Sequence, residues 1–217
     1  MPLYFSAHSL LPAASGRISL LGQDLTHASI RYRNTHGISH VPEDRHRHGL
    51  VLDYRLDDNL VLQRYFEPDF QSGGFIRQDA VLDYAEELIE RFDIRSSNGP
   101  ASIARSMSGG NQQKAIVARE LDRASDLLIA MQPTRGLDVG AIEYIHKQLV
   151  RARDNGEAVL LVSFELDEVL ALADRILVVY EGEIVGELLP DSSEEFRTEI
   201  GLYMAGSKRG KEVAADE

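Results

Sequence analysis

The chain has 217 residues, a formal net charge of −12 at pH 7 and no cysteine. The length suits one domain with at most a small subdomain, and the absence of cysteine excludes disulfides and thiol catalysis. Nucleic acid is a poor partner for so acidic a chain, because phosphate contacts need clustered Lys and Arg. No apolar run approaches the ~20 residues of a membrane-spanning helix, and we expect a soluble, cytoplasmic protein.

The first regular elements lie in the N-terminal quarter. Residues 1–14 have no clear period and contain two prolines, so we treat them as an atypical N-terminal segment. Arg17 to Leu21, followed by Gly22, predicts a strand and a turn. Gly37 to Val41 predicts a second short strand, which Pro42 ends.

The next segment is mainly helical. Aliphatic and aromatic residues recur at helical spacing over residues 53–65 and 79–92, with a pair of glycines between the two helices. Asn98-Gly99-Pro100 then breaks the chain. We expect an inserted helical subdomain over about residues 51–119.

Helices and strands alternate over the second half of the chain. This alternation predicts a parallel α/β sheet with buried strands, covered on both faces. Charged, Ala-rich residues follow, and we expect 207–217 to be a disordered tail. The predicted elements are a helix over 110–122, a strand over 127–131, a helix over 139–155, a strand over 158–164, a helix over 166–173 and a hairpin of 176–180 with 183–188.

The stretch Ser106 to Lys114 (SMSGGNQQK) carries the clearest chemistry. A serine and two glycines stand at the predicted start of a helix, where unpaired N–H groups and a partial positive charge favour an anion. Glycines let a phosphate approach the backbone, and the hydroxyl of Ser108 adds a donor. The alternative is an ordinary serine N-cap, which is common.

The longer run SGGNQQKAIVARELDRASDLLIAMQPTRGLDVGA resembles the signature-to-D-loop block of ABC ATPases, in the branch of importers for simple sugars and nucleosides. The later VLLVSFELDEVLALADRILVVYEGEIVGE resembles the switch strand and C-terminal hairpin of that branch. The resemblance covers about residues 15–187. It implies an α/β fold over residues 15–206: an incomplete P-loop NTPase core with a parallel sheet, the inserted helical subdomain and the hairpin.

The resemblance also implies site residues. Ser108, Gly109 and Gly110, with Asn111 beside them, would contact the γ-phosphate of ATP held by an opposing domain. Asp138 would be the D-loop aspartate that communicates across the dimer. ATP would therefore be a cofactor in trans.

Residues that the family uses for hydrolysis are replaced. The chain contains no G-x-x-x-x-G-K-[ST] phosphate loop. Met131 and Gln132 stand where the family has a Mg²⁺-binding Asp and a catalytic Glu, and neither a thioether nor an amide can do that chemistry. Phe164 stands in place of the switch His, and Glu43 in place of the Q-loop Gln.

These departures resemble the second, degenerate nucleotide-binding domain of a fused importer ATPase, which would have no catalytic or metal-binding residue of its own and would meet Mg²⁺ only through the partner site. The implied partners are membrane permease subunits, another nucleotide-binding domain and, indirectly, a solute-binding protein, with the chain held at the inner face of the membrane by the permease. Two other functions stay open: a non-catalytic interaction or regulatory module, which includes a truncated remnant, and a self-sufficient ATPase.

Two clusters of polar residues suggest sites that we do not favour. A His-rich stretch matches no zinc spacing, and we expect a solvated basic loop there, which by resemblance lies near the permease. A group of glutamates in the 79–92 helix is typical of a solvated face. The clusters are His36, His40, His46 and His48, and Glu86, Glu87 and Glu90.

Overall fold

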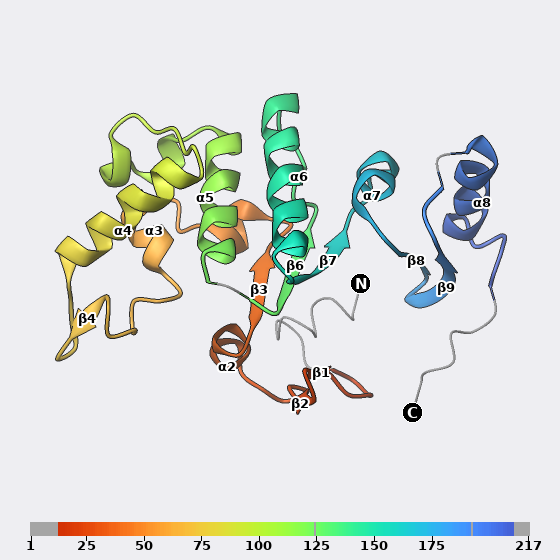
Figure 1. Cartoon of the computed structure of the whole chain (residues 1–217), viewed down its shortest axis with the longest axis horizontal. Coiled ribbons are helices and arrows are strands. Elements are labelled where there is room, and N and C mark those ends of the chain that lie inside the picture. The colour runs from red at the N-terminus through yellow and green to blue at the C-terminus, as the bar shows by residue number, and fades with distance from the viewer. Residues whose placement is uncertain (1–12, 124, 192, 211–217) are drawn as a thin grey trace. The chain divides into compact units, whose positions relative to one another are not determined.

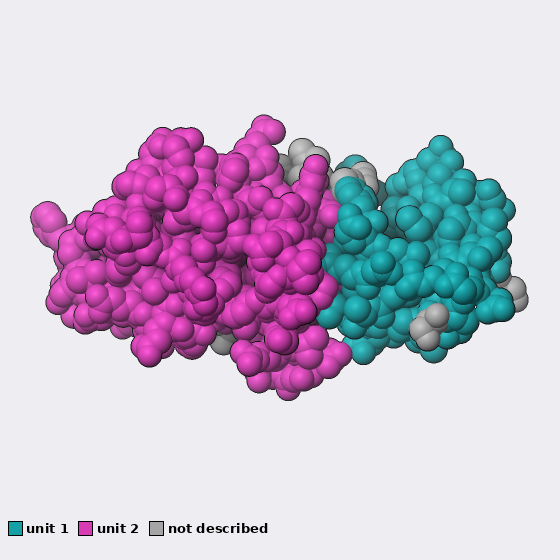
Figure 2. All heavy atoms as spheres, turned by 90° about the horizontal axis from the view of Figure 1, so that it is seen from above, with its two compact units in different colours: residues 1–28, 163–217 teal, residues 29–162 magenta. Residues whose placement is uncertain are grey.

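The computed structural model describes residues 13–123, 125–191 and 193–210. They fall into two compact units, which Figure 2 colours separately. One unit contains residues 29–162, and the other contains residues 1–28 together with 163–217.

The unit of residues 29–162 is built on a parallel sheet with strand order β3-β6-β7 (Figure 1). Its strands are β3 (Ile38–Val41), β6 (Leu127–Met131) and β7 (Ala158–Val162). Every residue of β3 is buried, and so is β6 apart from its first residue. Burial on both faces explains why β6 (LLIAM) reads as a continuous apolar run, whereas β3 (ISHV) buries a serine and a histidine among its four residues. The predicted α/β architecture with a parallel sheet is confirmed.

The prediction of a buried strand over residues 158–164 is wrong in two respects. β7 ends at Val162, and it is not buried: Leu160, in its middle, is 38% exposed. Among the described residues β7 pairs only with β6, so it is an edge of the sheet. An apolar run predicts a strand, but its burial depends on neighbours that the run itself does not specify.

Helices and short turns complete this unit. They are α2 (Ile30–Thr35), the π-turn η1 (Arg45–Gly49), α3 (Leu56–Val61), α4 (Gln78–Arg91), the 3₁₀ turns η2 (Gly99–Ala101) and η3 (Ala104–Ser106), α5 (Gly109–Leu121) and α6 (Val139–Asp154). A small hairpin of β4 (Gln71–Ser72) and β5 (Phe75–Ile76) turns at Gly73 and Gly74, both with positive φ. One core joins α3 and α4 to α5, through Leu60, Leu88 and Ala118 among others.

The four histidines do not share one solvated loop, so that prediction is wrong for His40. His40 belongs to β3 and is buried, because both faces of that strand are covered. Its backbone N–H donates to the carboxylate of Glu120, at 3.2 Å. Desolvation lowers the pKa of the His40 imidazole to about 4. In η1, the ring of His46 hydrogen-bonds the side-chain oxygen of Gln112, at 2.9 Å.

In its described residues, the second unit has two hairpins and two helices. Its elements are β1 (Ser19–Leu20), β2 (Gln23–Asp24), α7 (Leu166–Leu172), β8 (Ile176–Tyr180), β9 (Glu183–Leu188) and α8 (Glu194–Met204). β8 and β9 turn at Glu181 and Gly182, which both have positive φ, as the sequence predicts. α8 packs Phe196 and Ile200 into a core with Val178.

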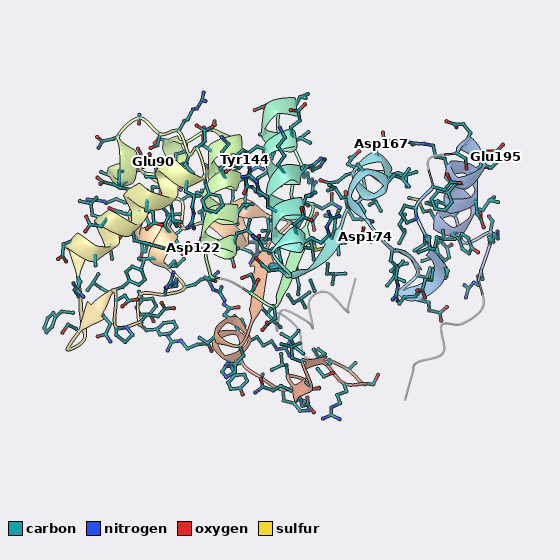
Figure 3. The ribbon with its side chains drawn as sticks, viewed as in Figure 1. Glu90, Asp122, Tyr144, Asp167, Asp174 and Glu195 are labelled. Carbon is teal, nitrogen blue, oxygen red and sulfur yellow. The ribbon has the colours of Figure 1, made fainter. Side chains whose placement is uncertain are left out.

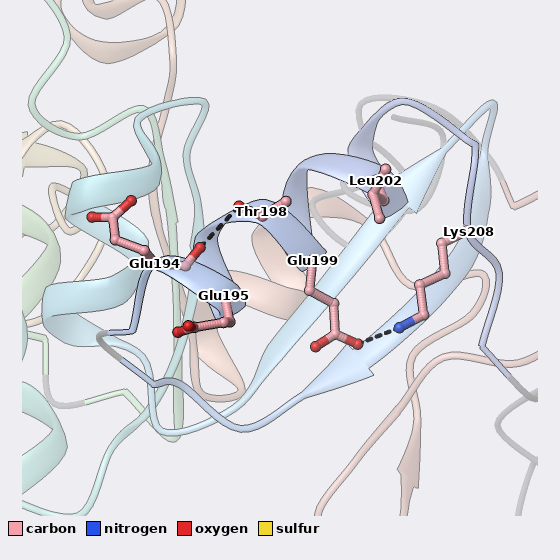
Figure 4. Close-up of a pocket in the computed structure, with 6 residues that line it drawn as sticks. All are labelled: Glu194, Glu195, Thr198, Glu199, Leu202 and Lys208. Carbon is pink, nitrogen blue, oxygen red and sulfur yellow. Dashed lines mark hydrogen bonds and ion pairs between the residues drawn. The ribbon is translucent and has the colours of Figure 1, made fainter.

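The start of the predicted disordered tail makes contacts with this unit. The backbone N–H of Gly210 donates to the carbonyl of Val185, at 2.7 Å. Lys208 pairs with Glu199 of α8 at 2.5 Å, beside an open hollow lined by Glu194 and Leu202 (Figure 4). Residues 211–217 lie outside the described residues, as do 1–12 of the predicted N-terminal segment. Nowhere in the described ranges is there a helix with the length and hydropathy needed to cross a bilayer.

Candidate functional site

The predicted signature residues lie at the start of α5. Ser108 is the N-cap residue, in extended conformation, and Gly109 and Gly110 open the helix. The Ser108 Oγ accepts a hydrogen bond from the side-chain Nδ2 of Asn111 at 2.9 Å, and a longer one from the backbone N–H of the same residue at 3.4 Å. These contacts satisfy the cap and keep the first turn of α5 in place.

The start of α6 lies directly beside the start of α5. Asp138 caps α6, and its carboxylate accepts from the backbone N–H of Ala141 at 2.9 Å. A Cβ atom on Gly110 would lie 3.3 Å from the Cβ of Ala141 and 3.7 Å from a carboxylate oxygen of Asp138. The fold therefore brings Asp138 next to the signature, and a residue larger than glycine at 110 would press on α6.

Arg45 is a site residue that the sequence interpretation missed. Its Nη1 donates to the carbonyl of Arg135 at 3.1 Å. Its Nη2 would lie 3.2 Å from a Cβ on Gly109 and 3.6 Å from one on Gly136, so the guanidinium fits against both glycines. Its Nε is buried and finds no hydrogen-bond partner within the described part of the chain. A cation and the positive ends of α5 and α6 thus meet at one place, which favours an anionic ligand.

The local sequence around Arg45 explains its direction. Asp44 caps the π-turn η1, and its carboxylate accepts from the backbone N–H groups of His46 and Arg47, both at 3.0 Å. This cap turns Arg45 toward α5, whereas Arg47 stays exposed. The charge pattern alone does not separate the two arginines.

Met131 ends β6 and Gln132 follows it, at the positions where the sequence resemblance expects an Asp and a Glu. Met131 is fully buried at the end of β6, so its side chain is part of the core. Gln132 has a φ of 48°, and its backbone N–H donates to the carbonyl of Val162 at 2.8 Å. Its side-chain Nε2 is buried without a partner. Mg²⁺ binds oxygen ligands, usually with at least one carboxylate, so the Met131 thioether is unsuited to it and the Gln132 amide offers only an uncharged oxygen.

Two further positions agree with this reading. Glu43 is held in an ion pair with Arg135 at 2.7 Å. The Phe164 side chain is 64% exposed and offers no polar atom. No group of three or more His, Asp or Glu side chains in the described part of the chain could hold a metal ion.

Polar contacts tie α5 to the segment that follows α4. The side-chain oxygen of Asn111 accepts from the backbone N–H of Arg95 at 2.7 Å. One turn further along α5, the Lys114 ammonium donates to the Asp93 carbonyl at 2.7 Å and to its carboxylate at 2.6 Å. It also lies 4.5 Å from the ring centre of Tyr144 on α6 (Figure 3). Burial raises the pKa of Tyr144 to about 12, and the charge of Asp93 adds to the effect.

The chain is similar to the ATP-binding proteins of importers. It is 50% identical over 192 residues to the nucleoside import ATP-binding protein NupA of Lactococcus lactis. The matched residues make up 88% of this chain and 37% of that protein. It is 48% identical to the guanosine import ATP-binding protein NupO of Bacillus subtilis, over 89% of this chain and 37% of that protein. It is 44% identical to the glucose import ATP-binding protein TsgD13 of Haloferax volcanii, over 91% of this chain and 36% of that protein.

The chain thus spans little more than a third of the length of these curated relatives. No protein-family model matches it. Among solved structures, a dimeric ATP-binding cassette bound to ADP and phosphate matches with a TM-score of 0.71 and 19% identity, over 88% of this chain and 80% of that one. A nucleotide-free cassette matches with a TM-score of 0.70, over 90% of this chain and 77% of that one. The fold is that of an ABC ATPase, and the curated relatives are import ATP-binding proteins for nucleosides, guanosine and glucose.

Proposed function

We propose that this chain, which has the ABC ATPase fold and resembles nucleoside and sugar import ATP-binding proteins, supplies the signature half of a composite ATP site. Ser108, Gly109 and Gly110 would contact the γ-phosphate of ATP held by another nucleotide-binding domain. Asn111 and Asp138 would border that contact. ATP would be shared in trans, and Mg²⁺ would be held by the partner domain alone.

The observation that carries this proposal is a contrast within one unit of the chain. At the start of α5, Ser108 caps the helix, Asp138 lies beside Gly110, and Arg45 lies beside Gly109. The end of β6, in contrast, has Met131, whose thioether is no ligand for Mg²⁺, and is followed by Gln132, whose neutral amide cannot accept a proton from water. The chain would bind and orient phosphate without cleaving it.

The proposed cargo and partners are taken from the relatives, which are import proteins. NupA, NupO and TsgD13 are import ATP-binding proteins for nucleosides, guanosine and glucose. We propose nucleosides or sugars as cargo of the whole importer. The partners would be permease subunits, a second nucleotide-binding domain and, indirectly, a solute-binding protein. The chain would be cytoplasmic and peripheral on the inner face of the membrane, held there by the permease.

The test is nucleoside and sugar uptake by cells that carry the chain in its assembled importer. Replacing Ser108 by Arg removes its hydroxyl and puts a long side chain at the start of α5, and we expect uptake to fall at least ten-fold, as when a group that stabilises phosphate charge is removed (roughly 10²-fold). The control is Ser106→Ala, because the Ser106 hydroxyl donates to the carbonyl of Ile103, at 2.7 Å, and not to the signature. Unchanged uptake with Ser108→Arg would contradict the composite site and favour an interaction module.

A further inference from the structure

We propose that Asn111 is a positioning residue for Ser108. By donating to the Ser108 hydroxyl oxygen, Asn111 leaves the hydroxyl proton free to be donated to an oxyanion. This inference rests on the proposed function, since it concerns the same anion site at the start of α5. It assigns Asn111 a role that differs from direct contact with the phosphate. Three hydrogen bonds around the Asn111 amide carry it.

The orientation of the Asn111 amide is fixed by a main-chain group. The backbone N–H of Arg95 can only donate, so the amide atom that it meets at 2.7 Å must be the oxygen, Oδ1. The opposite end of the amide, Nδ2, therefore faces Ser108 Oγ at 2.9 Å. Because Nδ2 has no acceptor lone pair in an amide, it donates to the serine oxygen.

The serine hydroxyl is then fully used as an acceptor. A hydroxyl has two acceptor positions and one proton. The Asn111 Nδ2 takes one acceptor position at 2.9 Å, and the backbone N–H of Asn111 lies toward the other at 3.4 Å. Among the described residues, no acceptor receives the Ser108 proton. It remains for a ligand, and the ligand atom that it fits is an acceptor such as a phosphoryl or sulfate oxygen.

The partner that fixes the amide is itself held on α5. Asp93, two residues before Arg95, has a φ of 46°. Lys114 holds it through both its carbonyl and its carboxylate, at 2.7 and 2.6 Å. The segment from Asp93 to Arg95 is thereby attached to α5 at two points one helical turn apart. This attachment keeps the Arg95 N–H where it selects one orientation of the Asn111 amide.

The experiment is a double-mutant cycle on the full chain, with sulfate as the probe because it stays a dianion near neutral pH. Amide resonances of Gly109 and Gly110 report binding in an NMR titration. Asn111→Ala should weaken sulfate binding roughly five-fold, the value of one hydrogen bond. In the Ser108→Ala background the same change should have no further effect, because the residue acts only through the serine. Asn98→Ala, an exposed asparagine outside the site, is the matched control and should bind as the wild type does.

Asn111→Asp gives a second variant that keeps an acceptor for the Arg95 N–H. The new carboxylate would accept the proton of Ser108, so that the serine could no longer donate it to sulfate. We expect Asn111→Asp to weaken sulfate binding, and to weaken it less in the Ser108→Ala background. Equal losses from Asn111 variants with and without Ser108 would overturn the positioning role and leave the proposed function standing. Wild-type chain without saturable shifts at Gly109 and Gly110 would instead contradict the anion site itself.

Discussion

Burial of His40 on β3 makes the folding free energy depend on pH. The pKa of this imidazole is lowered from 6.5 to about 4, chiefly by desolvation. Between these two pH values the imidazole is protonated in the unfolded chain but stays neutral in the folded chain. Folding is therefore unaffected by the His40 titration above pH 6.5, and the free energy of unfolding falls as the pH drops from 6.5 toward 4. Between pH 7 and pH 5, His40→Gln should therefore lose about 2 kcal/mol less stability than the wild type.

Urea unfolding at the two pH values checks this prediction. If wild type and His40→Gln lose the same stability, the imidazole is not held neutral by its burial.

Arg45 should contribute to anion binding through its position beside Gly109. Removing the charge in Arg45→Gln should weaken sulfate binding at the Gly109 and Gly110 amides about five-fold, because charge-assisted hydrogen bonds are the stronger kind. Arg47→Gln removes the same charge from the exposed side of η1 and should change the affinity less than two-fold in the same NMR titration, as expected of a screened surface charge. Equal effects of the two variants would mean that only the net charge matters.

Part of the candidate site could be predicted from single residues of the sequence, and part could not. Ser108 and its glycines could be predicted, because a helix start with small residues has a recognisable composition. That Asp138 caps α6 and lies beside Gly110 becomes visible only in the folded structure. Arg45 could not be predicted, since its direction depends on the Asp44 cap, and neither could the orientation of Asn111, which depends on a backbone N–H 16 positions away in sequence.

At the scale of elements, β7 differs from its neighbour although both strands are apolar. Leu160 pairs with Ile129 of β6, yet it is 38% exposed whereas Ile129 is fully buried. Leu160→Lys should cost less than about 1 kcal/mol of stability, and Ile129→Lys more than about 4 kcal/mol. Urea midpoints of the two variants measure the contrast. Similar costs would show that β7 is covered as completely as β6.

Elements with a clear apolar pattern or a turn glycine were mostly predicted, and elements too short to show a period were not. α5, β6 and the β8–β9 hairpin match their predicted ranges within one residue, because apolar periods and turn glycines define them. α2 and the β4–β5 hairpin are too short to show a period. α8 was missed although Phe196, Ile200 and Tyr203 recur at helical spacing after the cap residue Ser193, a signal that was present in the sequence.

At the scale of the whole chain, one restored residue should not produce an ATPase. Gln132→Glu returns a carboxylate to the end of β6, but the chain still has no phosphate loop and still has Met131 in the core. Purified wild type and Gln132→Glu should both release phosphate from Mg-ATP at the background rate, as a colorimetric phosphate assay would show. Turnover by either protein would instead favour a self-sufficient ATPase.

The pairing of β3 with β6 also has a consequence for how the chain is made. The two strands are neighbours in the sheet, but residues 42–126, with the whole helical subdomain, lie between them in the sequence. At roughly 5–20 residues per second on the ribosome, β3 emerges several seconds before its partner exists. During that interval β3 has no β6 to pair with, so the nascent helical subdomain can fold before this strand pair forms.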